Sequence, residues 1–100
     1  MYKQKERQKM GDEEKIDGMI HRGETDAAIA WLNGMIAQGT PPADRWYYLL
    51  GNAYRKQGDF SQAQNCYMEA IDINPDSPAA EAHRMLTGII EFYHKDYYNP

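Results

Sequence analysis

Two amphipathic stretches joined by a glycine, within residues 43–75, constrain the fold more than any other feature of the chain. The first stretch runs from about Ala43 to Gln57, and Gly58 after it fits the left-handed position that commonly ends a helix. Asp59 can then cap a second helix, which must end before Pro75. The apolar residues of this second helix recur at helical spacing: Ala63, Cys66, Tyr67, Ala70 and Ile71. The segment therefore predicts two helices that pack against each other as a pair.

Small and aromatic residues in this segment follow the spacing of a known repeat. The tetratricopeptide pattern begins with an aromatic residue, then a Leu-Gly pair, then a second aromatic residue. An alanine, a third aromatic residue and a proline follow at fixed intervals. The matching residues here are Tyr47, Leu50, Gly51, Tyr54, Ala63, Tyr67 and Pro75. The segment thus resembles a tetratricopeptide repeat, with tyrosine in place of the motif's tryptophan and phenylalanine. The resemblance implies an all-α fold and a role in binding another protein, without naming that protein.

A weaker copy of the pattern lies 35 residues upstream. Its matching positions are Gly23, Ala28, Leu32 and Met35. They predict a first helix from about Asp12 to Arg22 and a second from Thr25, as N-cap, to Gln38. The Leu-Gly and Pro positions of the motif are missing from this copy, which is typical of terminal repeats.

A fifth helix is predicted from about Pro78 to His94 or beyond, with Ser77 as its N-cap and a broad apolar stripe. We interpret it as a cap on the apolar edge that a stacked repeat leaves open. The expected organisation is a basic disordered tail (1–10) and one tetratricopeptide-like domain (11–100). Within that domain we expect a degenerate repeat (11–39), a full repeat (43–76), a capping helix (77–96) and a tail (97–100). The expected architecture is all-α: two antiparallel helix–turn–helix repeats plus the cap, forming a short right-handed solenoid. We expect the aromatic segment 92–100 to fold back onto the helices, with binding to a partner or self-association as the alternatives.

Charge and composition exclude several classes of function. Residues 1–10 carry four bases against one acid, whereas the other ninety carry seven bases and fourteen acids, so nucleic acid is not an expected partner. No run of about 18 apolar residues predicts a membrane span. The three histidines and the single cysteine have no metal-ligand spacing, and no phosphate-binding loop is present, so we predict neither an enzyme nor a cofactor. If no signal segment was removed upstream, a cytoplasmic location is expected.

The candidate binding residues follow from the resemblance, because the first helix of each pair lines a concave groove in that family. On this chain the groove would present Arg45, Tyr48, Asn52, Arg55 and Lys56, together with Asp17 and His21 from the first helix. Asn52 occupies a position that other members use to hold an extended peptide. Basic groups beside it suit an acidic or C-terminal peptide.

Other interpretations of these residues stay open. All of them can be ordinary solvated helix residues, and Asp17 with His21 can be an exposed pair one turn apart. Acidic residues on the first helix, and Tyr48 in a slot for a basic residue, argue against a clamp for a terminal dicarboxylate. Trp46, Tyr47 and Tyr48 are consecutive and cannot share one face, so Trp46 or Tyr48 should lie near the surface. The predicted function is peptide or protein-segment binding in the groove. The alternative is weak self-association, or an assembly role, with no peptide ligand.

Overall fold

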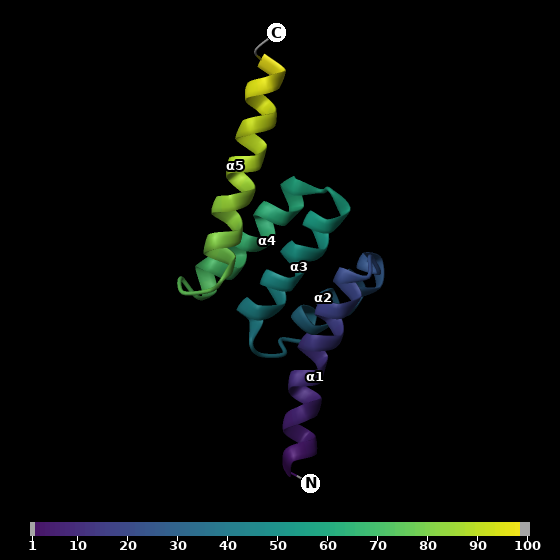
Figure 1. Ribbon diagram of the computed structural model, residues 1–100. Coiled ribbons are helices and arrows are strands. Elements are labelled where there is room, and N and C mark those ends of the chain that lie inside the picture. The colour runs from purple at the N-terminus through teal and green to yellow at the C-terminus, as the bar shows by residue number, and fades with distance from the viewer. Residues whose placement is uncertain (1, 99–100) are drawn as a thin grey trace.

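The computed structural model describes the backbone of residues 2–98 and the side chains of residues 11–92. Over this part of the chain there are five α-helices and no strand. The helices are α1 (Tyr2–His21), α2 (Thr25–Ala37), α3 (Ala43–Gln57), α4 (Phe60–Ile73) and α5 (Ala79–Tyr98). Short loops join α1 to α2 and α3 to α4 as antiparallel pairs, and α5 packs on α4 (Figure 1). The predicted all-α helical-repeat fold is confirmed.

The first helix is longer than the sequence pattern predicted. It begins at Tyr2 instead of near Asp12. The reason is intrinsic propensity. These residues are mostly lysine, glutamine, glutamate, arginine and methionine, which favour helix without needing an apolar stripe, and no proline interrupts them.

Local capping fixes the ends of the inner helices. Gly58 has φ 85°, and its amide and that of Asp59 donate to the carbonyls of Arg55 and Tyr54, which closes α3 in the left-handed manner predicted. A carboxylate oxygen of Asp59 accepts from the Gln62 amide at 3.2 Å, and the Ser77 hydroxyl accepts from the Ala79 amide at 3.1 Å. These side chains therefore begin α4 and α5 as predicted.

Thr25 departs from its predicted role. The N-cap of α2 is Glu24, and Thr25 is the first residue of the helix, with its side chain buried. Its hydroxyl accepts a hydrogen bond from the Gln57 side-chain amide at 2.8 Å, and a second such bond joins Gln57 to Asp26 at 2.7 Å. Thr25 thus ties the start of α2 to the end of α3 instead of capping its own helix.

The core consists of two clusters of buried side chains. One lies among α1, α2 and α3, includes Ile16, Leu32 and Trp46, and also takes in Cys66 of α4. The other joins α4 to α5 through Tyr67 and Leu86. Tyr47, Tyr48 and Tyr54 of α3 contact both clusters. Helix α3, the first helix of the motif, is therefore the central element of the described fold.

The C-terminal helix extends beyond the packed body. Its first half packs on α4, where the Gln64 amide donates to the Thr87 hydroxyl at 3.1 Å. Its second half continues away from the other helices (Figure 1). The predicted folding back of the aromatic segment is therefore wrong for the backbone through Tyr98, because the helix does not bend there. Residues 99–100 of the expected tail lie outside the described residues.

Candidate functional site

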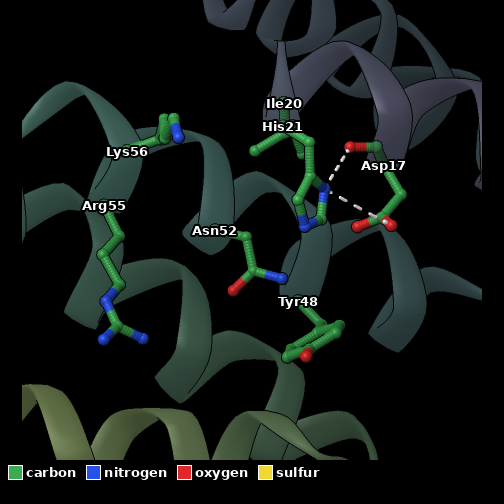
Figure 2. Close-up of a pocket in the computed structure, with 7 residues that line it drawn as sticks. All are labelled: Asp17, Ile20, His21, Tyr48, Asn52, Arg55 and Lys56. Carbon is green, nitrogen blue, oxygen red and sulfur yellow. Dashed lines mark hydrogen bonds and ion pairs between the residues drawn. The ribbon is translucent and has the colours of Figure 1, made fainter. Parts of the chain in front are cut away.

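The largest concentration of predicted site residues lines one hollow between α1 and α3, which we call the α1–α3 hollow. Its volume is about 550 Å³. Figure 2 shows the side chains that line it: Asp17, Ile20, His21, Tyr48, Asn52, Arg55 and Lys56. Six of the seven were predicted from the sequence, and they come from helices that are far apart in the chain. Helical spacing explains this grouping, because Tyr48, Asn52, Arg55 and Lys56 are three or four residues apart and share a face of α3.

Asn52 at the centre of the hollow is held in place by the core. The Tyr67 hydroxyl donates to Asn52 Oδ1 at 2.6 Å, and the Tyr67 ring lies 6.3 Å from that of Tyr48, centroid to centroid. Burial raises the pKa of the Tyr67 hydroxyl, and the nearby Arg55 guanidinium opposes this rise only in part. Tyr67 therefore stays protonated at neutral pH and keeps donating. With its oxygen occupied, the amide turns its nitrogen toward His21 and the interior of the hollow (Figure 2).

His21 forms the opposite wall of the hollow from α1. Its Nδ1 lies 2.8 Å from the backbone oxygen of Asp17 and 3.6 Å from that residue's carboxylate. A carbonyl oxygen can only accept, so Nδ1 carries a proton and donates to it. In the neutral ring, Nε2 is then the acceptor. The hollow thus presents both a donor, from Asn52, and an acceptor, from His21.

Arg55 and Lys56, the two cations of the hollow, differ from Arg45 in whether they form an ion pair with a carboxylate. Neither Arg55 nor Lys56 forms an ion pair with a carboxylate in the part of the chain whose side chains are described. Arg45 instead donates from Nε to a Glu13 carboxylate oxygen at 2.9 Å.

Arg45 also lies in a different place from the other predicted residues. It lines an adjoining hollow of about 240 Å³ that shares Asp17 and Tyr48 with the α1–α3 hollow. The structure therefore does not bring Arg45 together with Arg55 and Lys56. Together the two hollows form a groove that is basic at the end of α3 and acidic toward Glu13 and Glu14.

One lining residue was missed by the sequence analysis. Ile20 belongs to the apolar stripe of α1, and that stripe signals only burial; indeed Ile20 is 5% exposed. The sequence required that Trp46 or Tyr48 lie near the surface, and Tyr48 is the one that does. Trp46 is buried and donates from Nε1 to the Thr40 carbonyl at 2.9 Å, whereas Tyr48 is half-buried in the hollow.

Metal binding and thiol chemistry have little support among the described side chains. No three histidine, cysteine, aspartate or glutamate residues gather there to hold a metal ion. Cys66 is buried in α4, and that burial, with Glu69 and Asp59 adding to it, raises the pKa of its thiol to about 11. A thiol with so high a pKa is a poor nucleophile at neutral pH. Among the described helices, none combines the length and the apolar character needed to cross a membrane.

Comparison with known proteins agrees with the helical-repeat fold. The family model of the tetratricopeptide repeat matches residues 45–77. The solution NMR structure of Bacteroides fragilis protein BF1650 is similar to the chain with 42% identity and a TM-score of 0.78, over 87% of this chain and 88% of that one. No curated protein matches the chain at a significant level. The chain belongs to the tetratricopeptide-repeat family. Repeats of this family are non-catalytic and generally mediate contacts between proteins.

Proposed function

We propose that the chain binds an extended acidic peptide segment of another protein in the α1–α3 hollow. The observation that carries the proposal is the pairing state of the cations: Arg55 and Lys56 face the hollow without a carboxylate partner among the described side chains, whereas Arg45 is neutralised by Glu13. A carboxylate of the peptide would supply the missing charge.

Asn52 and His21 give the proposed ligand its backbone contacts. The hydrogen bond from Tyr67 to the Asn52 oxygen fixes the orientation of the amide, so the Asn52 nitrogen can donate to a peptide carbonyl. The neutral ring of His21 can accept from a peptide amide. Such a donor and acceptor pair suits an extended backbone, which offers both groups in alternation. Acidic residues at the other end of the groove favour a ligand whose negative charge lies only near Arg55 and Lys56.

Fluorescence anisotropy with labelled peptide pools tests this proposal. The probe is a pool of hexapeptides with acidic residues in their C-terminal half, and a basic pool with the same label is the ligand control. We expect the acidic pool to bind with a dissociation constant on the order of 10–100 μM, since the hollow is small, and the basic pool to bind at least tenfold more weakly. Comparing free-acid and amidated C-termini distinguishes a terminal carboxylate from an acidic side chain.

Variants then locate the binding. Lys56 is exposed, so Lys56→Ala should weaken binding about fivefold, as expected for one charge-assisted contact, without changing the melting temperature. Arg84→Ala on α5 is the matched control, because Arg84 is exposed and lies outside the hollow. Equal affinities of the parent, Lys56→Ala and Arg55→Ala proteins would place binding elsewhere and overturn the proposal.

A further inference from the structure

The outer side of α5 carries an apolar stripe that no described helix covers. This α5 stripe consists of Met85, Gly88, Ile89 and Phe92, which line a shallow hollow of about 580 Å³. Met85 is 50% exposed and Phe92 59% exposed. The spacing of three, one and three residues places all four on one side of the helix. The stripe shares no residue with the α1–α3 hollow.

Comparison of α5 with α3 shows why the stripe stands open. Helix α3 is covered on two sides, by α2 and by α4, whereas α5 packs closely on α4 alone. The packed side of α5 is a separate stripe that includes Ala79, Leu86 and Ile90. Met85 lies about 100° around the helix from Leu86, so it cannot reach α4 by the same face. In a stacked helical array, a second apolar side of this kind is where another helix packs.

We propose that the α5 stripe of a second copy of this chain covers it, in an antiparallel pair related by a two-fold axis. Two identical stripes satisfy each other in such an arrangement, because each copy buries the same surface that it covers. With the axis near Gly88, Met85 of one copy lies level with Phe92 of the other, a favourable contact between sulfur and ring. Gly88 leaves space near the axis, since nothing lies within 4 Å of where its Cβ would be.

Charge at the border of the stripe selects the antiparallel direction. Arg84 and Glu91 are seven residues apart, which is two turns, so they border the stripe on the same side. A two-fold axis perpendicular to the helices brings these borders together and exchanges their ends. Along the helix axis, Arg84 of each copy then lies about 3 Å from the level of Glu91 of the other copy, which its long side chain can span. Arg84 is exposed and already bonds Glu81 of its own helix at 3.2 Å, so it can be shared between two carboxylates.

The size of the stripe predicts a weak dimer. A stable interface buries about 800 Å² on each partner, and three apolar side chains on one helix supply less than that. We therefore expect a dissociation constant on the order of 100 μM.

Sedimentation equilibrium of the 100-residue chain between about 10 μM and about 1 mM measures this association, because mass action makes a weak dimer depend on concentration. The mean mass should rise toward twice the monomer mass. Met85→Glu and Ile89→Glu should each raise the dissociation constant at least tenfold. Met68→Glu on α4 is the matched control, since Met68 is 53% exposed and lies outside the stripe. Circular dichroism checks that all variants keep their helix content. A monomer throughout this range, or equal weakening by Met68→Glu, would overturn the proposal.

A charge exchange and a cross-link test the direction of the pair. Glu91→Arg should weaken the dimer by placing two arginines together, and the double variant Arg84→Glu with Glu91→Arg should restore it. Gly88→Cys should form a disulfide-linked dimer on mild oxidation, whereas Gly34→Cys, at another open helical glycine, should stay monomeric. If the exchange fails to restore association and Gly88→Cys does not cross-link, the antiparallel pairing is wrong.

Discussion

Tyr67 connects the packing of the molecule to the candidate site. Its ring is fully buried between α3 and α4, and its hydroxyl fixes the Asn52 amide at the centre of the α1–α3 hollow. A repeat motif places an aromatic residue at this position for packing, and tyrosine in place of phenylalanine adds the hydroxyl that Asn52 needs. Asn52 is therefore both a structural and a candidate binding residue. Its replacement by alanine would leave the Tyr67 hydroxyl without its partner, which costs about 1–3 kcal/mol.

The buried thiol of Cys66 makes a prediction about alkaline stability. Its pKa is about 11 in the folded protein against an ordinary 9.0. Below pH 9 both states are protonated and the contribution to stability is fully present. Between pH 9 and 11 the unfolded chain loses the proton first, so the free energy of unfolding falls as the pH rises, by roughly 1–2 kcal/mol.

Urea unfolding of the parent and of Cys66→Ala at pH 7, 9 and 10.5 checks this. The variant should lose less stability on going to high pH, although the raised pKa of Tyr67 leaves part of the dependence in place. The same pH dependence in both proteins would show that the thiol is not shielded from solvent as described.

At the scale of helices, the close approach of α3 and α4 depends on a missing side chain. A Cβ at Gly51 would lie 2.6 Å from Cδ1 of Tyr67 and closer still to Cε1. Gly51→Ala should therefore cost about 1–3 kcal/mol through overpacking, even though alanine favours helix. Gly34→Ala in α2 is the control. Nothing lies within 4 Å of a Cβ there, so that variant should gain up to about 1 kcal/mol. Thermal unfolding of both compares them directly, and a stabilised Gly51→Ala would contradict the packing of the helix pair.

The sequence predicted the inner helices better than the outer ends, and the reason is physical. Helices α3 and α4 have both an apolar face and explicit capping residues, Gly58 and Asp59, so their predicted limits agree with the structure. The start of α1 and the end of α5 have no such capping residues in the sequence, so their limits could not be predicted from it. Contacts between side chains across the hollow could not be predicted from the sequence either. The pairing of Arg45 with Glu13 depends on how α1 crosses α3, which periodicity does not specify.

At the scale of the whole molecule, the stability of each helix pair depends on the element stacked next to it. The described helices pack mainly with their neighbours in sequence order, as in other repeat proteins, so stability is a sum of local interfaces. The cluster of Ala63, Tyr67 and Ala70 is sealed on its outer side by α5. This arrangement also keeps the α1–α3 hollow dependent on α5, because the Tyr67 that positions Asn52 belongs to that cluster.

Truncation after Pro78 tests whether α5 acts as this seal. The shortened protein should expose the cluster around Tyr67, and so bind a hydrophobic dye such as ANS and aggregate at concentrations where the parent stays dispersed. Truncation after Phe92 is the control, because it keeps the half of α5 that contacts α4 while removing the extending half. That protein should retain cooperative unfolding and bind no dye. A dispersed, cooperatively folding protein ending at Pro78 would show instead that α4 tolerates exposure of its apolar face to solvent. In that case α5 contributes more to self-association than to stability.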